Sequence, residues 1–245
     1  MTVKLTISYD GTDFCGWQRQ KNGVSVQETV ENALFAVTGD KIKIVGSGRT
    51  DAGVHAEGQV ASFRTDKTIP PEKYAKALNT VLPQNVKIIK SELAPDGFDA
   101  CRTAKKKTYE FRAYVSDTVL PLLDRYSTRI TDYPKIDFLK MESAARLFLG
   151  THDFKAFSSS GNSSLTTVRT IYDIAVKKSG NEIVITVTGN GFLYNMVRII
   201  AGVLVAVSKG EMEENEIVKM FETGVKPMKV KTLSARGLFL KSVEY

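Results

Sequence analysis

The segment with the greatest chemical potential is residues 46–55, which read Gly-Ser-Gly-Arg-Thr-Asp-Ala-Gly-Val-His. Three of its first eight residues are glycine, which favours an unusual backbone path. It does not fit a phosphate-binding loop, because it lacks a Gly-Lys-Ser/Thr ending and we expect a strand, not a helix, after it. We interpret it as a loop that presents Arg49, Asp51 and His55. The alternative is a tight turn with an Arg–Asp pair at the surface, which would contribute little to stability.

A second candidate is Arg198, the only charged residue between Asn190 and Ser208. The surrounding sequence is apolar on nearly every side of the expected helix, so we expect the helix to be buried. A buried guanidinium requires a carboxylate partner, because an unpaired buried charge costs several kcal/mol. Asp51 is an attractive partner. The alternatives are that Arg198 reaches solvent or pairs with another acid.

Aromatic residues next to basic ones form a third pattern. Tyr109 follows the run Lys105-Lys-Lys-Thr, and such interleaving suits RNA, whose bases stack on rings while lysines track phosphates. The alternative is that Tyr109 is a core residue beside solvated lysines. Phe14 and Trp17, in the loop after the first expected strand, could anchor that loop or contact nucleotides. His152 is interpreted as part of a structural corner.

Composition limits the classes of protein. The formal charge of +7 and the pI near 9.2 favour polyanionic partners, with nucleic acid ahead of an acidic membrane surface. The N-terminus lacks the apolar region of a signal peptide, and the longest apolar stretch is too short to span a membrane comfortably. The two cysteines suggest no disulfide framework, so we expect a reducing cytoplasm. Cys15, Cys101, His55 and His152 lack the spacing of a zinc site.

Both halves of the chain show the same succession of elements. In the first half we expect strands at residues 3–9, 41–45, 59–63 and 86–93, a helix capped by Ser25 and Glu28, and a helix at 71–80. In the second half we expect strands at 109–115, 168–176, 183–187 and 238–243, and helices at 136–149, 195–208 and 215–223. The join lies near residues 100–107, and the Ser-, Gly- and Asn-rich stretch 158–164 is an expected mobile loop.

Two β-α-β-β-α-β units predict an α/β protein of the α+β type, with two ferredoxin-like halves whose antiparallel sheets flank a central catalytic cleft. Residues 1–103 would form the half that carries the Asp51 loop. Residues 104–245 would form the half that carries Tyr109 and the helix of Arg198.

The ordered motifs resemble the tRNA pseudouridine synthase A family. The resemblance extends over nearly the whole chain and rests on six segments: Tyr9-Asp-Gly-x-x-Phe-x-Gly-Trp-Gln-x-Gln, Gly48-Arg-Thr-Asp-Ala-Gly-Val-His, Ala104-x-x-Lys-x-Tyr-x-Phe, Gly150-x-His-Asp-Phe-x-x-Phe, Asn190-x-Phe-x-x-x-Met-Val-Arg, and Gly237-Leu-x-Leu. It implies that the enzyme isomerises uridines at positions 38 to 40 of the tRNA anticodon arm. It also implies a homodimer in which one tRNA touches both subunits.

The resemblance implies a role for each matching residue. Asp51 would be the nucleophile, and Arg49 would hold the flipped nucleotide and its phosphate. Tyr109 would stack on the uracil and assist removal of the C5 proton. Arg198 would form a salt bridge with Asp51 and keep it ionised. Leu240 would pack against the base.

The chemistry breaks the N1–C1′ bond and rejoins the turned uracil through C5, with the base first leaving its stack. Attack by the carboxylate at C1′ or at C6 remains open. The reaction includes no redox step and no group donor, so we expect no cofactor and no catalytic metal.

The sequence departs from the family pattern at three places, so the pattern does not predict the contacts with tRNA there. Lys107 stands where Arg is usual, Cys101-Arg102 where Arg-Phe is usual, and Phe111 where Tyr is frequent. Two rival functions are a non-catalytic RNA-binding module and a hydrolase acting on a nucleoside or glycoside. An RNA-binding module does not need a pairing of Asp51 with Arg198, and a glycoside hydrolase usually requires a second carboxylate close to the first.

Overall fold

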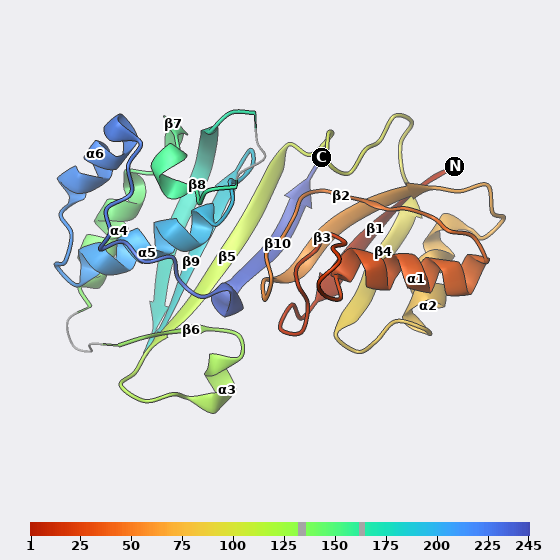
Figure 1. Cartoon of the computed structure of the whole chain (residues 1–245), viewed down its shortest axis with the longest axis horizontal. Helices are drawn as coiled ribbons and strands as arrows, with labels where there is room; N and C mark the ends of the chain where they lie inside the picture. Colours follow the sequence, from red (N-terminus) through yellow and green to blue (C-terminus); the bar gives the residue numbers. More distant parts are fainter. Residues whose placement is uncertain (132–135, 162–164) are drawn as a thin grey trace. The chain divides into compact units, whose positions relative to one another are not determined.

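The computed structural model describes residues 1–131, 136–161 and 165–245. It divides into two compact units, shown in Figure 1. Unit 1 contains Met1–Lys105 together with Phe239–Tyr245, and unit 2 contains Lys106–Leu238. Part of the expected mobile loop, residues 162–164, lies outside the described residues.

The strands of unit 1 come from separate segments of the chain, and burial alternates strictly along the first of them, β1 (Thr2–Tyr9). The sheet that they form also contains β2 (Val45–Gly46), β3 (His55–Arg64), β4 (Val86–Leu93) and β10 (Leu238–Glu244). β1 lies between β3 and β4 and is antiparallel to both. β2 pairs with the end of β3 in antiparallel fashion, and β10 pairs in parallel with its beginning.

Two helical segments cover this sheet. α1 (Val26–Thr38) starts at Ser25, whose side chain accepts a hydrogen bond from the amide of Glu28, and it ends at Gly39 in the left-handed conformation. A 3-10 turn (Pro71–Lys73) leads into α2 (Tyr74–Asn79). Tyr74 is fully buried and packs edge-on against Phe63 of β3.

Unit 1 therefore has the predicted β-α-β-β-α-β succession, with the spatial order 4-1-3-2 of its own four strands. The strand predicted at 41–45 is wrong over most of its length, because only Val45 and Gly46 pair with β3. β3 starts four residues earlier than predicted, at His55.

The strands of unit 2 are antiparallel in the order β5 (Lys106–Val115), β9 (Glu182–Gly189), β8 (Val168–Ser179) and β7 (Gly150–Asp153). The short β6 (Thr128–Ile130) pairs in parallel with the end of β5. The predicted strands at 109–115, 168–176 and 183–187 are confirmed with longer bounds. β6 and β7 were not predicted.

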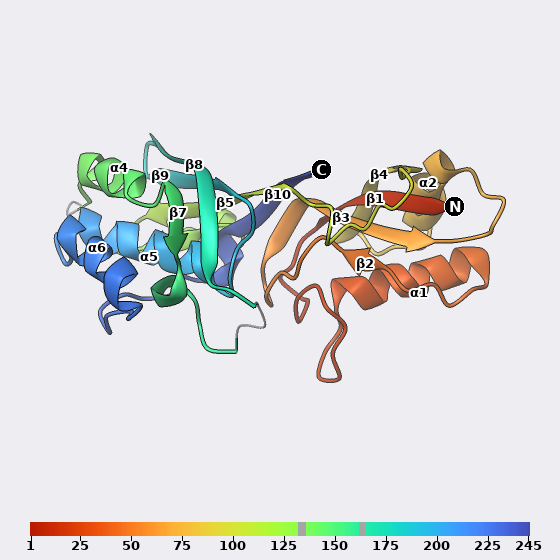
Figure 2. The same cartoon turned by 90° about the horizontal axis from the view of Figure 1, so that it is seen from above.

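The helices of unit 2 are α3 (Pro121–Asp124), α4 (Phe138–Arg146), α5 (Met196–Ser208) and α6 (Glu214–Thr223), with 3-10 turns at Lys155–Phe157 and Ala235–Gly237. α4 packs against α5 and β8 (Figure 2). Every residue of α5 is buried except Arg198, which is half-buried. The prediction of a buried helix is therefore confirmed.

The fold is of the predicted α+β type, but the division of the chain differs from the predicted 1–103 and 104–245. The first boundary falls two residues later, after Lys105. The last strand was expected in the second half, whereas Phe239–Tyr245 belong to unit 1 because Phe239 and Leu240 pair with His55 and Ala56 of β3.

Candidate active site

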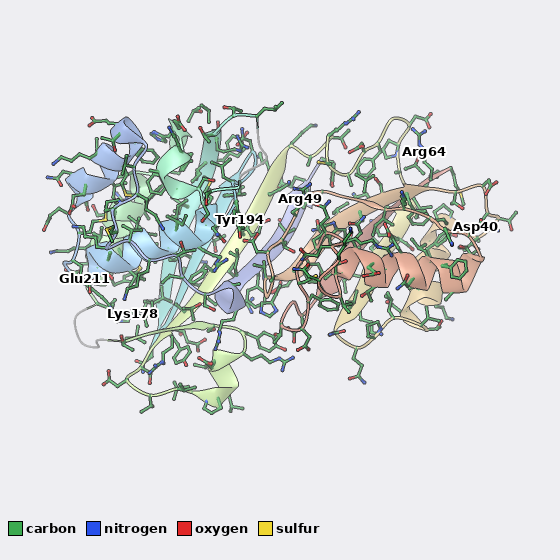
Figure 3. All side chains as sticks on the ribbon, in the orientation of Figure 1. Asp40, Arg49, Arg64, Lys178, Tyr194 and Glu211 are labelled. Atoms are coloured by element: carbon green, nitrogen blue, oxygen red, sulfur yellow. The ribbon has the colours of Figure 1, made fainter. Side chains whose placement is uncertain are left out.

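The loop that carries Asp51 connects β2 and β3 in unit 1. Along it, exposure changes from residue to residue: Arg49 is exposed, Thr50 is only 7% exposed, and Asp51 is half-buried. Figure 3 shows Arg49 on this connection. The loop therefore presents a guanidinium and a carboxylate while it buries the residue between them.

Thr50 is held by both its main chain and its side chain. Its carbonyl oxygen accepts a hydrogen bond from the amide of Trp17 at 3.0 Å. Its hydroxyl lies 2.7 Å from the phenol oxygen of Tyr9. The next residue closes a turn, because the Val54 amide donates to the carbonyl of Asp51 at 3.1 Å. The backbone on both sides of Asp51 is thus fixed without regular secondary structure.

A buried polar network supports the start of the loop. The Ser47 hydroxyl donates to Oε1 of Gln59 at 2.6 Å, and Nε2 of Gln59 donates to the carbonyl of Gly48 at 3.0 Å. Ser47 and Gln59 are both fully buried. Buried amides and hydroxyls are stabilising only when they are hydrogen-bonded, as these are.

Two glycines allow the loop after β1 to lie against the Asp51 loop. Gly16 has φ of +108°, and a Cβ there would be 2.6 Å from the carbonyl oxygen of Thr50. A Cβ at Gly46 would be 2.4 Å from Nε1 of Trp17. Trp17 and Phe14 are themselves buried, so they anchor the loop and are not a nucleotide-binding surface.

His55 was predicted to be presented by the loop, and this prediction is wrong. It is the first residue of β3, only 1% exposed, and its ring stacks on Phe239 of β10 with centroids 4.7 Å apart. Its Nδ1 lies 3.1 Å from the Gly11 amide nitrogen and 3.1 Å from Oδ1 of Asp10. Nδ1 cannot accept a hydrogen bond from the Gly11 amide and donate one to Asp10 at the same time. The neutral Nε2–H tautomer therefore accepts from Gly11, whereas a protonated ring donates to Asp10.

Leu240 lies close to the same loop in the fold of unit 1. It is 1% exposed and pairs with Ala56, the residue after His55. β10 therefore places Phe239 and Leu240 beside β3, the strand that begins at the end of the Asp51 loop. The sequence did not predict this proximity, because the paired residues are almost two hundred positions apart.

Arg198 is in the first turn of α5, as predicted. Its Nε donates to the carbonyl of Leu233 at 2.6 Å and its Nη1 donates to Oδ1 of Asn195 at 2.6 Å. Asn195 has φ of +62° and precedes the helix as its N-cap. These neutral acceptors within unit 2 orient the guanidinium. Its pairing with Asp51 joins residues of two units and stays a prediction.

Tyr109 lies on β5 opposite Val187 of β9 and is 8% exposed. Its ring packs edge-on against Phe192, with centroids 5.0 Å apart. The alternative interpretation, in which Tyr109 is a core residue, is therefore correct. Its stacking on a base stays a prediction. His152, stacked on Phe221 at 4.5 Å, has the structural role that was expected.

Tyr9 and Thr50 stand in the quoted motifs, but neither they nor Ser47 and Gln59 were predicted to hold the Asp51 loop. The one available signal was Gln59, a polar side chain at a position that must be buried if the expected strand is central. Among the helices of the described residues, none is long and apolar enough to cross a membrane.

Comparison with known proteins identifies the family. A family model described as tRNA pseudouridine synthase matches residues 5–101 and 144–245. Curated relatives named tRNA pseudouridine synthase A are 43% identical over 243 residues in Acetivibrio thermocellus, 43% over 244 in Ruminiclostridium cellulolyticum and 40% over 243 in Thermoanaerobacter pseudethanolicus. Each alignment covers 99% of both chains.

A solved structure, the archaeal box H/ACA sRNP Nop10–Cbf5 complex, aligns with a TM-score of 0.38 and 10% identity over 83% of this chain and 43% of that chain. The family model and the nearly full-length identities show that this α+β chain, with its anchored Asp51 loop, belongs to the tRNA pseudouridine synthases.

Proposed function

We propose that this chain isomerises uridine to pseudouridine in tRNA, at positions 38 to 40 of the anticodon arm, with Asp51 as the nucleophile. In this proposal the enzyme acts in the cytoplasm as a homodimer. The names of the full-length relatives support tRNA as substrate. The formal charge of +7 also favours a polyanion.

The reaction rearranges bonds within one nucleotide. The N1–C1′ bond breaks, a C1′–C5 bond forms, the C5 proton leaves to solvent and N1 gains a proton. The target base must first leave its stack, which costs a few kcal/mol. Attack by Asp51 at either C1′ or C6 requires an ionised carboxylate with a fixed approach.

The observation that carries the proposal is the anchored Asp51 loop. The backbone is held at Thr50 and Val54, yet Asp51 remains half-buried and Arg49 is exposed. Such an arrangement suits a carboxylate that must meet a reacting atom, since positioning of the attacking group supplies a large part of many rate enhancements. Arg49 would bind the phosphate of the flipped nucleotide.

The other site residues take the roles that the family resemblance implies. Tyr109 stacks on the uracil and its hydroxyl assists departure of the C5 proton. Arg198 pairs with Asp51 and keeps it ionised, and its bonds to Leu233 and Asn195 support a fixed orientation of the guanidinium. Leu240 packs against the base.

The test is release of tritium from C5-tritiated uridine in an unmodified tRNA transcript, by the wild type, Asp51→Asn and Asp13→Asn. Asp13 is an exposed acid of the neighbouring loop and serves as a matched control. We expect release by the wild type and by Asp13→Asn, and a loss of at least about 10⁴-fold in Asp51→Asn with tRNA still bound. Retained turnover in Asp51→Asn would disprove the nucleophile assignment. Free uracil as product would favour the hydrolase.

A further inference from the structure

Two hydroxyls meet in the interior of unit 1, directly beside Asp51. Tyr9 is 4% exposed and Thr50 is 7% exposed, and their oxygens are 2.7 Å apart. Desolvation of two hydroxyls is costly unless they bond to each other, and a phenylalanine with a valine would fill the same space without that cost. The hydrogen-bonded pair therefore has a role other than filling space in the core.

The fold directs the Tyr9 hydroxyl towards the loop. Pairing between β1 and β3 proceeds from Ile7–Gln59 to Tyr9–Ala56, so two steps along β1 correspond to three along β3. Such a bulge re-aims the side chains beside it. The Tyr9 ring also lies near Trp17, with centroids 6.1 Å apart, and Trp17 is the residue that donates to the carbonyl of Thr50.

Thr50 is consequently tied at two points, and the two ties have different functions. The bond from the Trp17 amide fixes the position of the peptide that joins Thr50 to Asp51. The bond between the hydroxyls holds the Thr50 side chain in place and so restrains the backbone just before Asp51. A change at Tyr9 would alter the aim of Asp51 and leave its chemistry intact.

We infer that Tyr9 is a positioning residue for Asp51 and acts through the hydroxyl of Thr50. The inference rests on the proposed function, because it assumes that Asp51 reacts. Productive geometry must hold to within about 0.5 Å. Loss of the hydroxyl pair therefore slows the chemical step, while tRNA affinity, which is dominated by phosphate contacts, stays nearly the same.

The experiment measures single-turnover tritium release, with enzyme in excess over C5-tritiated tRNA, and the Kd of each variant for tRNA. The variants are Tyr9→Phe, Thr50→Val, the double variant and Thr50→Ser, which keeps the hydroxyl. The matched control is Tyr114→Phe. Tyr114 is a fully buried tyrosine of unit 2 whose phenol donates to Oδ1 of Asp124 at 2.9 Å and accepts from the amide of Leu120 at 3.3 Å, so this variant also loses the hydrogen bonds of a phenol.

We expect a rate loss of about tenfold in Tyr9→Phe and in Thr50→Val, and a loss in the double variant no larger than that of Tyr9→Phe, because both substitutions remove the shared Tyr9–Thr50 bond and Tyr9→Phe also removes the contact with Gln59. Thr50→Ser should stay within about threefold of the wild type, Tyr114→Phe should keep the wild-type rate, and the Kd should change by less than about threefold throughout.

A wild-type rate in both Tyr9→Phe and Thr50→Val would overturn the inference while the proposed function stood. An equal loss in Tyr114→Phe would also overturn it, because general destabilisation would then explain the effect. If Tyr9→Phe does not fold, Thr50→Val and Thr50→Ser decide the question alone. A wild type that releases no tritium would overturn the proposed function, and the inference with it.

Discussion

The amide of Trp17 donates to the carbonyl oxygen of Thr50 at 3.0 Å, across the narrow space that Gly16 leaves between their loops. This bond links residues 33 positions apart in the sequence and ends one residue before Asp51. The conformation of the candidate nucleophile therefore depends on a loop that supplies none of the proposed reacting groups.

Gly16→Ala should disable the enzyme. The new Cβ would lie 2.6 Å from the Thr50 carbonyl oxygen, and φ of +108° is strained for alanine. We expect tritium release to fall by more than about 100-fold and the free energy of unfolding to fall by about 2–4 kcal/mol. The control is Gly39→Ala at the end of α1, where φ is +76° and no neighbouring atom lies within 4 Å. It should cost about 1 kcal/mol and leave the rate unchanged, and equal rates in the two variants would contradict the close-packing argument.

Arg198→Ala should damage both folding and activity. The substitution removes the 2.6 Å donors to the Leu233 carbonyl and to Oδ1 of Asn195, so we expect about 1–3 kcal/mol of lost stability in urea unfolding. Tritium release should fall by at least about 100-fold if the guanidinium is the counter-ion of Asp51. Arg146→Ala, which removes an exposed charge in the last turn of α4, should keep the wild-type stability and the wild-type rate of tritium release. A stable and fully active Arg198→Ala protein would show that the pairing with Asp51 is wrong.

Two substitutions at Tyr109 separate stacking from proton removal. Tyr109→Phe keeps the ring that packs on Phe192 and loses only the hydroxyl, so tRNA affinity should persist while C5 tritium release falls by about 10²–10⁴-fold. Tyr109→Leu loses the ring as well, and should weaken the binding of the flipped base by about 1–3 kcal/mol in addition. Wild-type release by Tyr109→Phe would limit the residue to stacking.

Alkaline stability should report the burial of Tyr9. Burial raises the pKa of Tyr9 far above its ordinary value of 10.0, and the Thr50 and Gln59 side chains offset this only in part. Because the unfolded phenol ionises near pH 10 and the folded one does not, the stabilising contribution is complete below pH 10 and is lost as the pH rises above it. The pKa of Tyr245 is raised by burial in the same direction.

Urea unfolding at pH 8 and pH 11 checks this expectation. Tyr9→Phe should be less stable than the wild type at pH 8 by about 1 kcal/mol, because it lacks the bond to Thr50. The deficit should shrink at pH 11, where the wild type loses up to about 1.4 kcal/mol per pH unit for this group. A constant difference between the two proteins at both pH values would show that Tyr9 ionises equally in the folded and unfolded chains.

Local signals in the sequence were sufficient for much of the fold. β4 has the predicted bounds, Val86–Leu93, because a strand of alternating residues is a local pattern. Ser25 caps α1 as predicted, since its bond to the Glu28 amide spans only three residues. The α+β class followed from the succession of such elements.

The errors concern contacts between distant residues. Residues 41–44 have apolar alternation but do not pair with β3, and β10 belongs to unit 1 because of pairs almost two hundred residues apart. The burial of His55 depends on Phe239, which no spacing rule relates to it. The anchors of Asp51 were missed for the same reason, since Tyr9 and Thr50 are 41 residues apart.

The parallel pairing of β10 with β3 also has a consequence for biosynthesis. A ribosome makes β3 early, but it makes Phe239 and Leu240 only after all of unit 2 has been translated. Until then His55 lacks its stacking partner and Ala56 lacks its neighbour. A nascent chain that stalls or is cut within unit 2 would carry Asp51 on an unfinished support. Assembly of the Asp51 region therefore waits for nearly full-length synthesis.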